Sequence, residues 1–144
     1  GILFTGDSGA GKTTQARLWE QFRNAEMVCN DRTAIRRENG VWRTYGFFID
    51  GSEPIYRFGS WKGGCIVALE QSHQNQIVRL KGLRAVKILM KQLVVDAWNV
   101  QMCSEMIQRI TDLLQELPVY HLKCTPDIRA VECLETQLRK DGIL

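Results

Sequence analysis

The chain has 144 residues, of which 44% are hydrophobic and 24% charged, and its formal net charge is +3. This composition excludes an intrinsically disordered chain, and this length predicts one domain over residues 1–144 with a sizeable core. No apolar stretch approaches about 18 residues, and no run of five like charges is present, so we expect neither a membrane nor a nucleic acid as partner.

The chain contains an odd number of cysteines and no C-x-x-C pair. They are Cys29, Cys65, Cys103, Cys124 and Cys133. This pattern predicts reduced thiols and a cytoplasmic location. Because the first residue is a glycine and not methionine, we also expect that N-terminal residues are missing from this sequence.

The N-terminal third begins with a strand, a glycine-rich turn and a helix. The apolar run Gly1–Thr5 predicts a buried strand. Apolar residues at 16, 18, 19 and 22 have helical spacing after the glycines of residues 6–13. The segment Glu26–Asn30 predicts a second short strand that leads into Asp31.

The middle of the chain has the strongest turn signal. Asn39-Gly40 separates two strand-like runs, residues 33–37 and 41–45, which predicts a hairpin. Residues 46–60 have no periodicity and contain three glycines and a proline, so we interpret them as a long loop.

The remaining elements mix strands and helices without strict alternation. Residues 64–69 predict a buried strand and residues 76–80 a short edge strand. Helical spacing covers residues 83–95, 102–117 and 128–138, and residues 119–123 predict a last strand. The predicted class is therefore α/β, a mixed β-sheet flanked by helices.

Residues 6–13 read GDSGAGKT and match G-x-x-x-x-G-K-[ST] completely. In this motif, glycines let successive backbone N–H groups point at a phosphate, and the helix that follows directs its positive end to the same anion. The motif therefore predicts a P-loop that binds ATP and Mg²⁺. The expected nucleotide-binding residues are Gly6, Asp7, Ser8, Gly9, Ala10, Gly11, Lys12, Thr13 and Thr14.

Two residues of the loop have predicted chemical roles. We expect the Lys12 ammonium to reach the β- and γ-phosphates as a catalytic group, and the Thr13 hydroxyl to ligate Mg²⁺. A P-loop enzyme also needs a carboxylate near the metal, usually at a strand end. Asp31 is the predicted metal ligand and the predicted catalytic carboxylate that accepts the hydroxyl proton, with Asp50, Glu53 and Glu70 in reserve.

The only histidines, His73 and His121, are interpreted as structural or solvated. No cysteine–histidine spacing predicts zinc, and no nucleophile elbow is present.

The sequence resembles the HPr kinase/phosphorylase catalytic domain and, more closely, small HPr-kinase-like proteins, some of which accompany peptide-modification systems. Its nucleotide site also resembles that of phosphoenolpyruvate carboxykinase. The matching segments are GILFTGDSGAGKTTQARLWE, CNDRTAIRRENGVWRTYG, GCIVALEQSHQNQIVRL and PVYHLKCTPD, which span nearly the whole chain in order. The resemblance implies a fold with a mixed sheet, and a homo-oligomer, since HPr kinases are hexamers.

The family usually has two adjacent aspartates after its second strand, where this chain has Asn30-Asp31. The resemblance implies that these acids bind Mg²⁺ and activate the attacking hydroxyl. Arg32 and Arg57 are available as positive groups for the γ-phosphate.

Three functions follow from these observations. The first is an ATP-dependent phosphotransferase that modifies a Ser or Thr hydroxyl of a protein or peptide. The second, favoured by Asn30, is a nucleotide-binding regulatory or partner module with little catalysis. The third is a carboxykinase-like enzyme acting on a small acid, ranked last because the chain has little room for a substrate domain.

Overall fold

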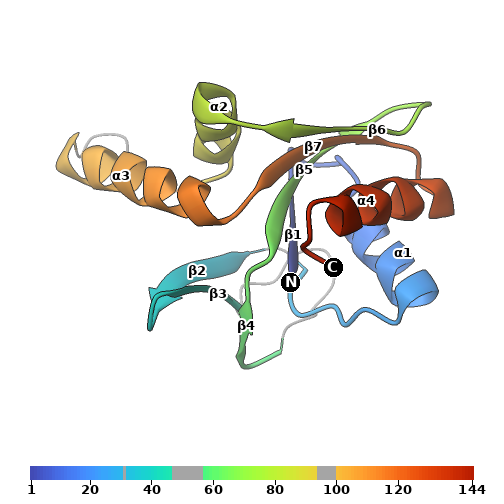
Figure 1. Cartoon of the computed structure of the whole chain (residues 1–144), viewed down its shortest axis with the longest axis horizontal. Helices are drawn as coiled ribbons and strands as arrows, with labels where there is room; N and C mark the ends of the chain where they lie inside the picture. Colours follow the sequence, from blue (N-terminus) through green and yellow to red (C-terminus); the bar gives the residue numbers. More distant parts are fainter. Residues whose placement is uncertain (31, 47–56, 94–99) are drawn as a thin grey trace.

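The computed structural model describes residues 1–30, 32–46, 57–93 and 100–144 (Figure 1). Their elements, in chain order, are β1 (Ile2–Thr5), α1 (Lys12–Arg23), β2 (Thr33–Glu38), β3 (Val41–Gly46), β4 (Ser60–Lys62), β5 (Cys65–Gln71), β6 (Gln76–Leu80), α2 (Gly82–Gln92), α3 (Val100–Glu116), β7 (Val119–Cys124) and α4 (Ile128–Lys140). The predicted mixture of strands and helices is confirmed.

The larger sheet has the strand order β1-β5-β7-β6. β1, β5 and β7 run parallel, and β6 runs antiparallel to β7, which confirms the predicted mixed sheet. The smaller sheet, β2-β3-β4, is antiparallel. Its first turn contains Asn39 and Gly40 with φ of 49° and 78°, the left-handed values that a tight hairpin needs, so the predicted hairpin is confirmed.

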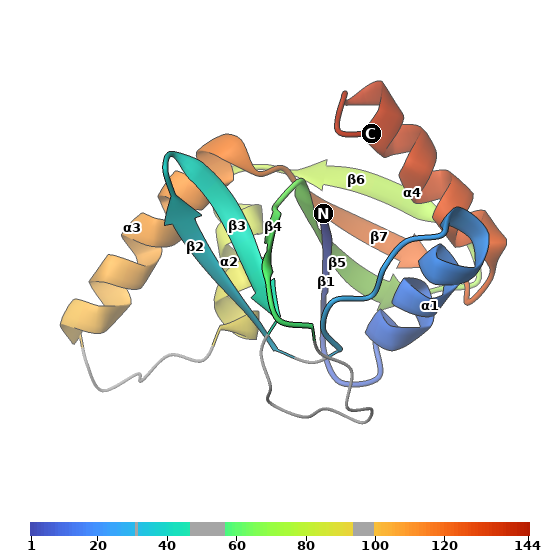
Figure 2. The same ribbon diagram turned by 90° about the horizontal axis from the view of Figure 1, so that it is seen from below.

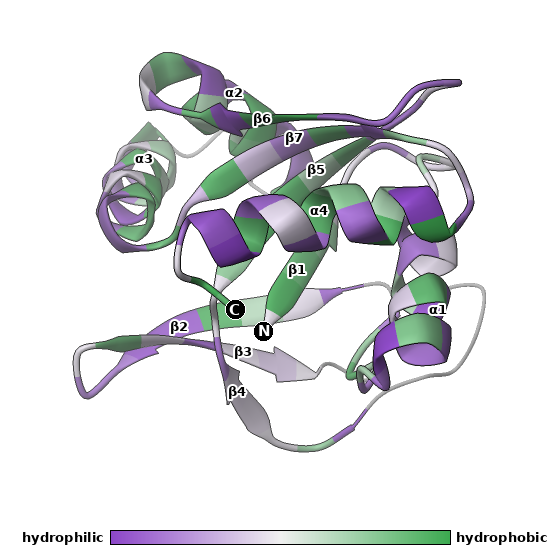
Figure 3. Cartoon of the chain, turned by 45° about the vertical axis from the view of Figure 1, so that its right-hand side comes forward, coloured by the Kyte–Doolittle hydropathy of each residue, from purple (hydrophilic) through white to green (hydrophobic). Residues whose placement is uncertain are grey.

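Helices cover both faces of the larger sheet (Figure 1). Side chains alternate along β5: Cys65, Val67 and Leu69 face the cluster formed with α1 and α4, and Ile66 faces the cluster formed with α2, α3 and Trp42. Figure 3 shows β1 and β5 as hydrophobic strands, with helices along which hydrophobic and hydrophilic residues alternate. β5 therefore belongs to both halves of the core.

Two sequence predictions need correction. β1 is half-buried at the edge of the sheet instead of buried, since its described sheet partner is β5 alone. Glu26–Asn30 forms no strand, only an isolated bridge at Cys29. Met27 is buried there, and the Val28 carbonyl accepts one backbone hydrogen bond from the Arg57 N–H. The apolar residues of this segment therefore reflect burial of side chains and not the repeated hydrogen bonds of a strand. Most of the predicted loop at 46–60 lies outside the described residues.

Within the described parts of the chain, no helix is both long and apolar enough to cross a bilayer. All five cysteines fall in those parts, and no disulfide joins them.

Candidate functional site

The glycine-rich loop, residues 6–11, connects the carboxyl end of β1 to the first turn of α1 (Figure 2). Its glycines Gly6, Gly9 and Gly11 have φ of 146°, 80° and 95°, a region that side chains with a Cβ rarely adopt. Gly11 caps α1 in the left-handed conformation, and no side chain bonds to the helix end. The first N–H groups of α1 therefore have no side-chain cap, as expected where an anion binds.

The three glycines serve different purposes. A Cβ on Gly6 would lie 3.0 Å from the Ala10 Cβ and 3.1 Å from the Leu69 carbonyl oxygen, so this glycine lets the loop pack against β5. A Cβ on Gly9 or Gly11 would meet nothing within 4 Å. The loop is therefore packed where it leaves the sheet and open along the part that precedes α1.

The Lys12 ammonium folds over the loop. Its Nζ donates to the carbonyl oxygens of Gly6, at 2.8 Å, and Asp7, at 3.0 Å. The loop also closes on itself through the Ala10 N–H, which donates to the Asp7 carbonyl at 3.1 Å. Among the described residues, two carbonyl dipoles and no carboxylate hold the positive charge at the loop, an arrangement that a stronger anionic acceptor can displace.

The Thr13 hydroxyl donates to Asn30 Oδ1 at 2.8 Å. This contact joins the first turn of α1 to the segment that precedes β2. The structure thus brings Asn30 to the residue predicted to ligate Mg²⁺, while the predicted acid, Asp31, lies outside the described residues. Asp50 and Glu53 do too. In the described part of the chain, no three His, Cys, Asp or Glu side chains gather as a metal cluster.

Two glutamine side chains brace the loop from other elements. Gln71, at the end of β5, donates from Nε2 to the Gly9 carbonyl at 2.5 Å. Gln92, at the end of α2, donates from Nε2 to Asp7 Oδ1 at 3.1 Å. The position of the loop therefore depends on both the neighbouring strand and the helix on the opposite face from α1.

A third glutamine anchors α1 beneath the loop. Gln15 is 1% exposed, and its Nε2 donates to the Thr125 carbonyl, just after β7, at 3.2 Å. Asn75 holds the same residue, accepting from the Thr125 N–H at 3.0 Å and donating to its hydroxyl at 2.8 Å. None of the three glutamines is among the residues predicted from the sequence. For Gln15 a signal existed, because it lies one helical turn before the buried Trp19.

The reserve acid Glu70 is already engaged. It accepts from Lys123 Nζ at 3.1 Å and lies 3.0 Å from His121 Nε2, on the neighbouring strand β7. The Lys123 ammonium, together with His121, holds the pKa of Glu70 below its ordinary value. We therefore interpret Glu70 and His121 as one cross-strand ion cluster, in agreement with a structural role for the histidine.

Several other predicted residues lie at the surface. Asp7, Ser8 and Thr14 are exposed, as expected for groups that meet a ligand from solvent. Arg57 pairs with Glu26, 2.6 Å between Nη1 and Oε1, with both side chains more than half exposed.

A hollow of about 520 Å³ lies at the opposite ends of the parallel strands from the loop. Its lining includes Trp42, Gly64 and Pro118, which lie before or beside the starts of β5 and β7. Arg79 and Asp141 also line it and already pair with each other at 3.7 Å. The glycine-rich loop lies at the other end of these strands, at the carboxyl edge where open α/β sheets bind ligands.

No protein-family model matches the chain, and comparison with curated proteins and with solved structures finds no match either.

Proposed function

We propose that this chain is an HPr-kinase-like P-loop phosphotransferase that transfers the γ-phosphoryl group of ATP to a Ser or Thr hydroxyl of a protein or peptide. The observation that carries the proposal is the glycine-rich loop: its glycines adopt left-handed backbone conformations, it follows a parallel strand, and it opens α1 without a side-chain cap.

The residues of the loop fit a phosphate. Space is open where Gly9 and Gly11 would carry a Cβ, so an oxygen can approach the backbone there. The N–H groups of the first turn of α1 and the Lys12 ammonium supply hydrogen bonds and positive charge to the same place. In this proposal Lys12 leaves the carbonyls of Gly6 and Asp7 and binds the phosphate oxygens.

The site also fits a hard cation. The Thr13 hydroxyl and Asn30 Oδ1 place two oxygen atoms 2.8 Å apart beside the first turn of α1. Mg²⁺ typically takes one or two protein oxygens and completes its shell with phosphates and water. When bound, Mg²⁺ would neutralise charge on the phosphate oxygens. We assign Thr13 to hold it, and Asp31 to accept the proton of the attacking hydroxyl.

Titration calorimetry with ADP and ATP, with and without Mg²⁺, tests the nucleotide site. Phosphotransfer is tested with γ-labelled ATP and a Ser/Thr peptide library, comparing the parent, Asp31→Asn and Lys12→Ala. We expect Lys12→Ala to lose nucleotide affinity and Asp31→Asn to retain most of it while losing turnover. Unchanged affinity in Lys12→Ala would show that the loop is only structural.

A second function, a nucleotide-binding regulatory module, is favoured by one observation. The side chain beside Thr13 is an amide, so the described part of the metal site carries no negative charge. If parent, Asp31→Asn and Asn30→Asp all bind nucleotide and are equally inactive, the regulatory module replaces the kinase.

A further inference from the structure

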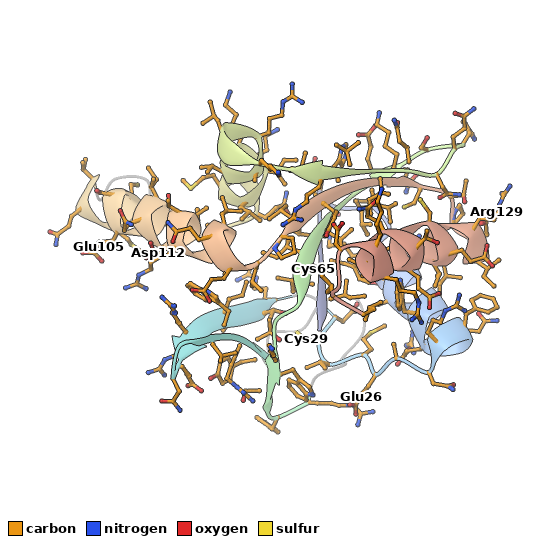
Figure 4. All side chains as sticks on the ribbon, in the orientation of Figure 1. Glu26, Cys29, Cys65, Glu105, Asp112 and Arg129 are labelled. Atoms are coloured by element: carbon orange, nitrogen blue, oxygen red, sulfur yellow. The ribbon has the colours of Figure 1, made fainter. Side chains whose placement is uncertain are left out.

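Helix α2 has a row of cations along its exposed surface. Arg84, Lys87 and Lys91 are exposed, and their spacing of three and four residues places them on one side of the helix. Figure 4 shows nitrogen-tipped side chains projecting outward from α2. We call these three residues the α2 basic stripe. Lys81, at the start of the helix, extends it by one more positive charge.

The α2 basic stripe has no negative partners among the described residues. The helix, GLRAVKILMKQ, contains no acid, and the ion pairs of the described residues do not include Arg84, Lys87 or Lys91. Several other exposed cations are paired, for example Arg37 with Glu116 and Arg129 with Asp127. The stripe therefore leaves its charge available to a partner.

The cations at the start of the stripe oppose the stability of the helix, whereas Lys91, in the last turn, meets the favourable negative end of the helix dipole. Cations near a helix N-terminus meet the positive end of the helix dipole, and here Lys81 and Arg84 occupy the start of α2, which has no side-chain cap. Like charges three or four residues apart also repel each other. A bound anionic partner would relieve both effects at once.

The stripe leads to the glycine-rich loop. Lys91 precedes Gln92, the residue whose side chain donates to Asp7 Oδ1 of the loop at 3.1 Å. At the helical rise of about 1.5 Å per residue, the stripe from Arg84 to Lys91 is about 10 Å long, which matches three to four extended residues of a bound segment.

We propose that the α2 basic stripe binds an acidic segment of the protein or peptide acceptor and so positions the acceptor hydroxyl near the glycine-rich loop. The role as acceptor site rests on the proposed phosphotransfer, whereas the docking itself does not. The expected substrate is therefore a Ser/Thr acceptor with an acidic cluster nearby.

The chemistry of the surface favours a polypeptide over other polyanions. The helix contains no aromatic residue on which a base could stack or that could anchor it in a membrane interface. Leu83, beside Lys87 on the helix surface, is 67% exposed and offers an apolar contact suited to a side chain.

Fluorescence anisotropy with a labelled 12-residue peptide tests the docking without nucleotide. The peptide contains four adjacent Asp/Glu residues and one Ser, and its companion has the matching Asn/Gln residues. We expect the full chain to bind the acidic peptide at least about tenfold more tightly than its Asn/Gln companion, and we expect this preference to disappear in about 0.5 M salt.

The variant Arg84→Glu/Lys87→Glu should lose this preference. Because it places an acid in the first turn of α2, the helix should not be weakened, which circular dichroism checks. The matched control Arg36→Glu/Lys140→Glu changes the net charge equally on other elements and should keep the preference.

The proposal is overturned if both peptides bind with equal affinity, or if the control variant loses the preference for the acidic peptide as fully as Arg84→Glu/Lys87→Glu does. Tighter binding of a single-stranded oligonucleotide or of anionic phosphatidylserine vesicles through the same residues also overturns it. The two proposals can fail separately. If the chain binds the acidic peptide but no nucleotide, the docking proposal holds and the kinase proposal is wrong. If it binds nucleotide but shows no preference for the acidic peptide, only the docking proposal is wrong.

Discussion

Thr13 and Asn30 are joined by a hydrogen bond of 2.8 Å, from the threonine hydroxyl to the asparagine side-chain oxygen. One belongs to the first turn of α1 and the other to the segment that leads into β2. Their contact determines which oxygens lie beside the first turn of α1, where we propose that a metal meets a nucleotide, and it can be changed without altering the glycine-rich loop.

Asn30→Asp should strengthen the Mg²⁺-dependent part of ADP binding. A carboxylate is a better ligand for Mg²⁺ than an amide, and it forms a stronger hydrogen bond with Thr13, of about 1.5–3 kcal/mol against about 1 kcal/mol for a neutral pair. Calorimetry with ADP in Mg²⁺ and in EDTA measures the effect. Asn30→Ala is the control and should weaken binding only in Mg²⁺; a rise in affinity that is equal in EDTA would contradict the reasoning.

Lys12→Ala should reduce ATP affinity at least about tenfold, because a charge-assisted hydrogen bond to phosphate is lost. The free energy of unfolding should change by less than about 0.5 kcal/mol, because the Lys12 contact with the Asp7 carbonyl is exposed and that with the Gly6 carbonyl is only partly buried, so water can solvate both oxygens. Urea unfolding and calorimetry on the same preparation separate the two quantities. A large loss of stability with normal affinity would assign Lys12 to the fold.

Gly6 and Gly9 should respond differently to alanine. Gly6→Ala should destabilise the chain by about 1–3 kcal/mol, because the new methyl group meets the Leu69 carbonyl and the backbone is strained. Gly9→Ala is strained at its φ of 80° but meets no atom, so it should reduce phosphate or nucleotide binding more than stability. Thermal unfolding with and without ADP distinguishes these outcomes; equal loss of binding in both variants would argue against a phosphate next to Gly9.

Acid should weaken the attachment of α4. Arg129 beside Asp127, the N-cap of α4, lowers the pKa of this carboxyl from 3.8 to about 2. Because the folded-state pKa is depressed, the carboxylate stabilises the fold above pH 3.8, and this stabilisation is lost as the pH falls toward 2. Asp127→Asn keeps the cap and should flatten the fall in melting temperature between pH 4 and 2. An unchanged slope would mean that other carboxylates dominate acid unfolding.

Much of this fold was predictable because its strands and helices differ clearly in periodicity. The continuous apolar run of β5 predicts a buried strand, and the regular apolar spacing of α3 and α4 predicts helices. The Asn39-Gly40 turn predicts the hairpin. The prediction of a strand at residues 26–30 was wrong because a short apolar run is equally compatible with a strand and with an irregular segment buried under side chains. Only long-range contacts, such as the bond from the Arg57 N–H to the Val28 carbonyl, distinguish the two.

The candidate site was predictable only in part, for a physical reason. The motif of residues 6–13 implies a phosphate loop, since the roles of its glycines and lysine are local. The amides of Gln15, Gln71 and Gln92 act across the fold, and nothing near them in sequence indicates their partners. The contact of Asn30 with Thr13 likewise depends on how the chain returns after α1. The ATP, Mg²⁺ and acceptor assignments remain predictions.

The strand order also constrains how the chain is made. β5 and β6 are separated by β7, which is synthesised after both of them and after α2 and α3. Until residues 119–124 leave the ribosome, the edges of β5 and β6 lack the partner they share, and the apolar β5 faces still await Tyr120, Leu122 and the fully buried side chains of α4. We therefore expect nascent chains from which β7 has not yet emerged to remain unfolded and chaperone-dependent. A ribosome that stalls early would release an aggregation-prone product, however stable the finished protein.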